Sequence, residues 1–165
     1  MRDYESGLTI SRLREVLEYS KHTGLFLWRM QRGNSVTVAG SIAGTTRADG
    51  YVRIKIDGNF YRAHRLAWFY VTGIWPSDQI DHKDRNRSNN RWNNLRQATR
   101  SQNGANMTRV KSSLKGAFKD GNRWRSHIKV SGRCIYLGMF GSPESAHSAY
   151  VEAAKKYHGE FSRFE

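Results

Sequence analysis

The sequence predicts an α+β protein of two parts, and three observations support this. Short runs alternate apolar and polar residues with a period of two, as half-buried strands do. Other runs space apolar residues by three and four, as amphipathic helices do. A polar stretch without either period follows residue 106, and we interpret it as a linker. We therefore expect domains at 1–107 and 113–165, with the linker at 108–112.

Before residue 78, the periodicity predicts two helices, a strand and a β-hairpin, in the order helix 8–19, strand 25–28, hairpin strands 51–57 and 60–63, and helix 64–71. Asp57-Gly58-Asn59 supplies the turn of the hairpin. The period of two places Arg53 and Lys55 together on its outer face. Such a basic face either contacts DNA or is simply solvated, and both alternatives stay open.

Residues 80–106 carry an unusual concentration of Asp, His, Asn and Arg. Asp81 and His82 follow a short apolar lead-in, and a long polar loop separates them from a second apolar run at Leu95. Thr99 can then cap a short helix. Hydrolysis of a phosphodiester needs a base to deprotonate water and a cation to hold the phosphate oxygens. His82 can be the base, and Asp81 can hold the cation together with a distant Asn or His.

The residues Asp81, His82, Asn94 and Asn103 resemble the Asp-His-Asn-Asn variant of the HNH endonuclease motif, which is found in phage homing endonucleases. The similarity extends to Arg62–Trp68 and to the pattern Asn-Leu-Arg-x-Ala-Thr-x-x-Gln-Asn. It implies a ββα-metal core at about 78–106 and a DNA endonuclease. His82 would be the general base, and Asp81 and Asn103 would hold one Mg²⁺ or Mn²⁺ ion. Asn94 would pin the loop through backbone hydrogen bonds and orient His82.

Other polar residues of this part have simpler expected roles. Arg96 or Arg100 can neutralise charge that develops on the phosphoryl group. His64 lies among aromatic residues, so we expect it to be a packing residue and not a ligand. Three asparagines are expected at turns, where Asn tolerates a left-handed backbone: Asn89, Asn90 and Asn93.

The C-terminal part is expected to form a three-stranded antiparallel sheet packed on one helix. Turns near residues 121 and 131 separate three runs, and the middle run, 123–130, alternates basic and apolar residues. Ser142-Pro143-Glu144 gives a cap, a proline and an acid in the order that starts a helix, and Gly159 ends it. One face of the sheet is therefore basic, and the helix covers the other.

This part resembles the Apetala-type (ethylene-response-factor) DNA-binding domain. The matching segments are Lys115-Gly116-Ala117, Trp124, Ile128-Lys129, 136–140 and 142–150. The resemblance and the basic face together imply these DNA contacts: Lys115, Arg123, Arg125, Lys129, Arg133 and Tyr136. Lys stands at 115 and 129 where the family usually has Arg, and Lys does not reproduce the bidentate contact of Arg with guanine. The preferred DNA sequence of that family therefore does not carry over.

The charge of the chain favours a polyanionic partner. Lys and Arg number 28 against 14 Asp and Glu, which gives a net charge of +14. Residues 83–100 hold six basic residues and one acidic, and residues 111–142 hold seven and one. Residues 143–165 hold three basic and four acidic residues, so the charge is concentrated in two segments. This distribution points to double-stranded DNA.

The composition also limits the compartment. Cys134 is the only cysteine, which excludes a disulfide framework and a cysteine-rich zinc site. The sequence shows no apolar signal region and no apolar run near the ~20 residues of a membrane span. We expect an intracellular, cytoplasmic protein of a bacterial or phage-infected cell, without membrane contact, as a monomer or weak dimer.

Three functions are compatible with these patterns. The leading one is a homing-type DNA endonuclease whose single active site per chain makes nicking the expected outcome. The alternative is a sequence-specific DNA-binding regulator with an inactive nuclease fold, which would bind DNA without cutting it. The third is an RNA-binding protein that stacks Trp and Tyr on unpaired bases.

Overall fold

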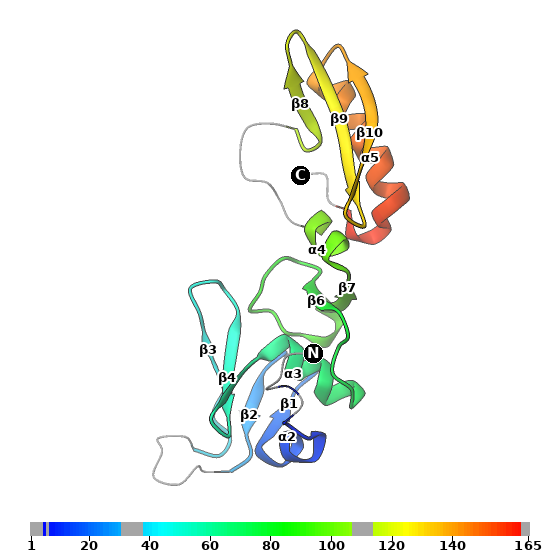
Figure 1. Cartoon of the computed structure of the whole chain (residues 1–165). Helices are drawn as coiled ribbons and strands as arrows, with labels where there is room; N and C mark the ends of the chain where they lie inside the picture. Colours follow the sequence, from blue (N-terminus) through cyan, green and yellow to red (C-terminus); the bar gives the residue numbers. More distant parts are fainter. Residues whose placement is uncertain (1–4, 6, 31–37, 107–113, 163–165) are drawn as a thin grey trace. The chain divides into compact units, whose positions relative to one another are not determined.

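The computed structural model describes residues 5, 7–30, 38–106 and 114–162. They form two compact units, Met1–Gln97 and Ala98–Glu165. Each unit combines helices and antiparallel strands around its own apolar core, which confirms the α+β class (Figure 1). The expected linker at 108–112 lies outside the described residues, so the domain boundaries stay a prediction. In the described ranges, no helix is both long and apolar enough to span a bilayer.

The first unit contains three small sheets, with the strand orders β1-β2, β3-β4-β5 and β6-β7. Its elements along the chain are α2 (Ile10–Val16), β1 (Leu17–Tyr19), β2 (Phe26–Trp28), β3 (Thr45–Thr46), β4 (Val52–Ile56), β5 (Asn59–Arg62), α3 (Ala63–Thr72), β6 (Gln79–His82), η1 (Trp92–Asn94) and β7 (Leu95–Ala98), the last of which ends at the boundary between the units.

The expected helix at 8–19 is correct at its start and wrong at its end. Thr9 caps α2 by accepting a hydrogen bond from the backbone of Arg12. The helix stops at Val16, and β1 pairs with β2, so that Leu17 lies opposite Trp28. Leu17 and Tyr19 are both buried while the residue between them is exposed. Pairing with β2 therefore overrides the helical spacing of the local sequence.

The hairpin of β4 and β5 forms as expected, with a shorter turn. Its turn consists of Asp57 and Gly58, whose φ angles of 46° and 84° are both positive. Two positive φ angles are typical of the tight turn that matches the twist of paired strands. Ile54 and Ile56 are buried in the core, and Lys55 faces outward. The hairpin leads directly into α3, whose apolar face packs on the same core.

The second unit is a three-stranded antiparallel sheet backed by a helix. Its elements are α4 (Arg100–Asn106), β8 (Ala117–Asp120), β9 (Arg123–Val130), β10 (Arg133–Phe140), α5 (Pro143–His158) and η2 (Gly159–Phe161), with the strand order β10-β9-β8. Ile128 of β9 packs on Tyr150 and Ala154 of α5. A Cβ atom at Gly116 would lie 2.2 Å from the Tyr150 ring, so only glycine allows the chain to pass this close to α5. The sheet and the helix confirm the predicted architecture.

Candidate active site

Asp81 and His82 form the end of β6, where the strand passes from the core to the polar loop. Ile80 precedes them and belongs to the core of the first unit. The side chains at 81 and 82 are themselves buried, with exposed fractions of 5% and 3%. Burial of two adjacent polar residues requires specific partners, because an unpaired buried polar group is costly. These partners define the site.

His82 is held as a neutral imidazole. Burial lowers its pKa below the ordinary value of 6.5, and a hydrogen bond with Asn90 opposes this effect without cancelling it. The rings of His64 and Tyr51 pack around it, with centroid distances of 5.1 and 6.0 Å. His64 is buried, as expected of a packing residue. A neutral imidazole near pH 7 is the form that accepts a proton.

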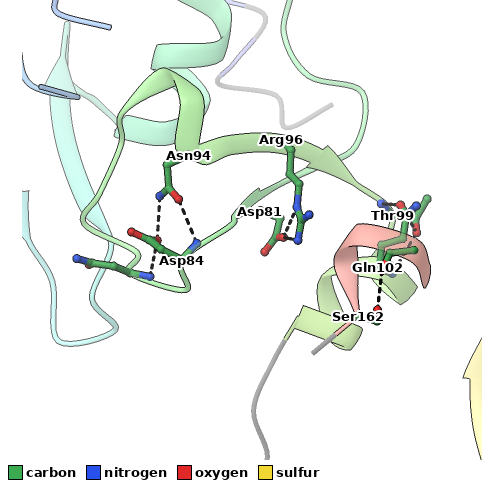
Figure 2. A network of polar contacts seen from close by, with 9 residues as sticks. Asp81, Asp84, Asn94, Arg96, Thr99, Gln102 and Ser162 are labelled. Carbon is green, nitrogen blue, oxygen red and sulfur yellow. Dashed lines mark hydrogen bonds and ion pairs between the residues drawn. The ribbon is translucent and has the colours of Figure 1, made fainter. Parts of the chain in front are cut away.

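Asp81 forms a buried ion pair with Arg96 of β7. Its Oδ2 atom accepts a hydrogen bond from Arg96 Nε at 2.9 Å and lies 2.9 Å from Arg96 Nη2 (Figure 2). Both side chains are largely buried, so water screens this pair less than it would screen a surface pair. The sequence suggested contact of Arg96 with phosphate. That role stays a prediction, and Arg96 has a carboxylate partner in this structure.

Asn94 fastens the two ends of the loop that follows His82. Its Oδ1 atom accepts from the backbone N–H of Asp84 at 3.1 Å, and its Nδ2 donates to Asp84 Oδ1 at 2.9 Å (Figure 2). Nδ2 also donates to the Asn89 carbonyl at 2.8 Å, and the backbone N–H of Lys83 donates to the Asn94 carbonyl at 2.9 Å. These bonds fix the backbone on both sides of the loop. They are the backbone contacts expected of Asn94.

Asp84 contributes a carboxylate to the same loop. Partial burial raises its pKa, but hydrogen bonds from Asn89, Asn94 and the backbone of Asn86 outweigh this effect. The pKa of Asp84 is therefore lowered, and the group is ionised at neutral pH. Its charge strengthens each of the hydrogen bonds that it accepts.

Asn103 lies on α4, which belongs to the second unit. Thr99 caps this short helix as expected: its hydroxyl accepts from the backbone of Gln102, whose side chain accepts in return from the Thr99 backbone. Asp81 belongs to the first unit and Asn103 to the second, so their joint binding of an ion stays a prediction. In the described parts of the chain, no three His, Cys, Asp or Glu residues gather as a metal cluster.

The segment that holds Asp81, His82, Asn94 and Asn103 is similar to known proteins. Residues 61–105 match the model of the HNH endonuclease family. This segment is therefore similar to the HNH endonucleases, over 45 of the 165 residues. A solved structure on DNA binding and cleavage by the HNH homing endonuclease I-HmuI is similar to the chain at 21% identity and a TM-score of 0.45, over 92% of this chain and 90% of that chain. No curated protein matches the chain.

The HNH match ends before the C-terminal sheet. The resemblance of residues 113–165 to an Apetala-type domain therefore stays a prediction. The match does cover Asp81, His82, Asn94 and Asn103. All four residues expected to carry the chemistry lie in the HNH segment, in the expected order along strand, loop, strand and helix.

The sequence missed one residue of the candidate site. Asn90 was expected to be a turn residue, like Asn89 and Asn93, because Asn tolerates a left-handed backbone. None of the three adopts that conformation. Among the non-glycine residues that the structure describes, only Asp57, Arg85 and Ser131 have positive φ. Asn90 is buried, with an exposed fraction of 3%, and its side chain contacts His82. No local pattern indicated this, because the contact depends on how the whole loop closes.

Basic side chains gather on the β3–β5 sheet of the first unit. A hollow of about 590 Å³ there is lined by Arg47, Arg53 and Arg62, together with Phe60 and Asp49. The Arg53 guanidinium lies over the Phe60 ring at 4.4 Å. Cation–π contacts and neighbouring positive charges suit a surface that binds a polyanion. The DNA-contacting roles of Arg53, which lines the hollow, and of Lys55 stay predictions.

The C-terminal sheet presents the basic face that the sequence predicted. Arg123, Arg125 and Lys129 are exposed on β9, while Ser126 and Ile128 between them are buried against α5. Other expected contacts are also at least partly exposed: Arg100, Lys115, Arg133 and Tyr136, the last with an exposed fraction of 61%. The DNA-contacting roles of these residues stay predictions.

Proposed function

We propose that the chain is a homing-type DNA endonuclease that nicks duplex DNA, with His82 as the general base. The observation that carries this proposal is the burial of a neutral His82 beside Asp81 at the end of β6, within a segment that matches the HNH endonuclease model. A neutral imidazole can take a proton from the water that attacks phosphorus. Asn94 supports the same step, since it fixes the backbone that follows His82.

The proposed donor set suits a hard divalent ion. A carboxylate oxygen from Asp81 and an amide oxygen from Asn103 are ligands that Mg²⁺ and Mn²⁺ take. One such ion per site would supply charge stabilisation at the phosphate oxygens and at the departing oxygen. Arg96 holds the Asp81 carboxylate in place through its guanidinium. This ion pair orients the carboxylate before DNA arrives.

The C-terminal sheet is proposed to dock the enzyme on its DNA site. Its central strand β9 carries exposed basic residues on one face only, and the chain has a net charge of +14. A face of this kind neutralises DNA phosphates, and each contact releases bound counterions. The basic hollow on the β3–β5 sheet would add phosphate contacts from the first unit.

Replacing Arg125 with glutamine is expected to weaken duplex DNA binding and to flatten its salt dependence. Loss of one phosphate contact lowers the slope of log K against log[salt] by about one. The matched control is Lys156→Gln on α5, which removes the same charge from a helix on the other side of the sheet. Equal slopes for both variants in a fluorescence anisotropy titration would contradict the docking role of β9.

The test of the proposed function is cleavage of supercoiled plasmid by the full chain with Mg²⁺, with Mn²⁺ and with EDTA. Metal-dependent conversion to open circles is the expected result. Linear product at the earliest times would contradict nicking and indicate two active sites acting together. Tight binding without cleavage under either ion would overturn the proposal in favour of a DNA-binding regulator with an inactive nuclease fold.

A further inference from the structure

The side chain of Asn90 bridges the loop and the catalytic histidine. Its Nδ2 lies 3.1 Å from the carbonyl of Ser88, and its Oδ1 lies 3.3 Å from Nε2 of His82. The contact with His82 is buried, and the contact with Ser88 is partly buried. Asn90 thus uses both ends of its amide, one for the backbone of the loop and one for the imidazole.

The chemistry of the two partners fixes the direction of each hydrogen bond. The Ser88 carbonyl can only accept, so the amide NH₂ of Asn90 must face it. The amide oxygen therefore faces His82, and an oxygen of this kind only accepts. His82 must then donate through Nε2. Because a neutral imidazole carries a single N–H, its Nδ1 is the unprotonated, basic nitrogen.

A remote segment of the chain holds Asn90 in this position. The Tyr19 hydroxyl donates to the Asn90 carbonyl at 2.6 Å, and burial raises the pKa of Tyr19 so that it remains a donor. Arg91 Nε donates to the carbonyl of His22 at 3.1 Å. A Cβ atom at Gly24 would lie 2.4 Å from Arg91 N and 2.5 Å from Asn90 C. The turn after β1 therefore fits closely against the backbone of residues 90 and 91.

Ring packing and hydrogen bonding have different effects on His82. His64 and Tyr51 contact the imidazole through their rings, which limits its tilt. Ring packing does not distinguish one nitrogen from the other. The Asn90 amide does so, because it offers only an acceptor to Nε2.

We propose that Asn90 is a positioning residue that fixes His82 in the tautomer protonated on Nε2, which makes Nδ1 the nitrogen that takes the proton from water. The effect of this tautomer on catalysis rests on the proposed function, whereas the assignment of the tautomer does not. Removal of a partner that orients a catalytic group commonly lowers activity by roughly 10- to 100-fold.

The experiment combines NMR of the metal-free full chain with cleavage kinetics. Two-bond ¹H–¹⁵N correlations of the His82 ring report which nitrogen carries the proton. The variants are Asn90→Leu, which removes the acceptor at similar volume, and Asn90→Asp, which keeps an acceptor oxygen. Asn93→Leu is the matched control, because it makes the same exchange at an exposed asparagine of the same segment. Tyr19→Phe removes the anchor of Asn90 while leaving its side chain intact.

The wild type and Asn93→Leu are expected to show the Nε2–H tautomer, and Asn90→Leu a mixture of both. Asn90→Leu should lower kcat by about 10- to 100-fold at saturating DNA, with KM changed by less than about twofold. Asn90→Asp should retain the Nε2–H tautomer, although it loses the donor to the Ser88 carbonyl. Tyr19→Phe should lower kcat less than Asn90→Leu does.

An Nδ1–H tautomer in the wild type would overturn the proposal. This test needs no variant, so it remains decisive even if Asn90→Leu folds poorly. An unchanged tautomer in folded Asn90→Leu would overturn it as well. Failure of the proposed function has a different signature: the wild type would show the Nε2–H tautomer and would never cut DNA.

Discussion

Replacing His82 with alanine is expected to lower kcat for DNA cleavage by about 10²–10⁴-fold, which is the usual contribution of a general base. His82 is buried and neutral beside Asp81, so its loss removes the proposed proton acceptor. Binding of DNA should remain close to that of the wild type, because an imidazole with an exposed fraction of 3% offers little surface to a duplex. Single-turnover cleavage with enzyme in excess measures the chemical step directly.

His22→Ala is the control for this substitution. The His22 side chain is exposed, and the contact described for this residue uses its backbone carbonyl. This variant should cut at the wild-type rate. If His82→Ala cleaves DNA at the wild-type rate with both Mg²⁺ and Mn²⁺, the general-base role is ruled out. If DNA binding is lost together with cleavage, the loop of the variant is misfolded.

Replacing Gly24 with alanine is expected to destabilise the first unit by about 3 kcal/mol or more. Gly24 has a φ of +76°, a region that costs other residues about 1–2 kcal/mol. The new Cβ would also lie 2.4 Å from Arg91 N, a backbone atom that cannot move aside without shifting the loop. Overpacking of this kind adds about 1–3 kcal/mol. Urea unfolding, followed by tryptophan fluorescence, measures the change.

Gly73→Ala separates the two causes. Gly73 has a φ of +75°, nearly the same as that of Gly24, but a Cβ atom there would have no atom within 4 Å. Its substitution should cost only the backbone term of about 1–2 kcal/mol. Similar losses at both positions would show that the fit between the β1–β2 turn and residues 90–91 contributes little. Because Asn90 belongs to that fit, Gly24→Ala should also slow cleavage more than Gly73→Ala does.

Local pattern was sufficient for most of the secondary structure. The alternation around Ile54 and Ile56 predicted the β4–β5 hairpin, and Ser142-Pro143-Glu144 predicted the start of α5. These signals are local, because side-chain period and capping depend on residues only a few positions apart. The predicted end of the first helix was wrong, because the pairing of β1 with β2 is a contact that the local sequence does not show.

His82 and Asp81 could be singled out because phosphodiester hydrolysis requires a base and a cation ligand, and Asn94 and Asn103 because they complete the resemblance to the HNH motif. His82 and Asp81 were expected at the end of a strand, and both lie there. Asn94 was expected to bind backbone, and it does. Their partners were not predictable. Arg96 was one of six basic residues in its segment, and only the fold places its guanidinium on Asp81.

By itself, the sequence determined the α+β class, the order of strand, loop, strand and helix around the HNH residues, and the basic face of the C-terminal sheet. These features follow from side-chain periodicity, capping and charge, which act over short distances along the chain. Only the tertiary structure decided that Tyr19 supports Asn90, and that Asn90 contacts His82. Such bonds join residues up to 71 positions apart, so they exist only after the loop has closed on the β1–β2 hairpin and excluded water.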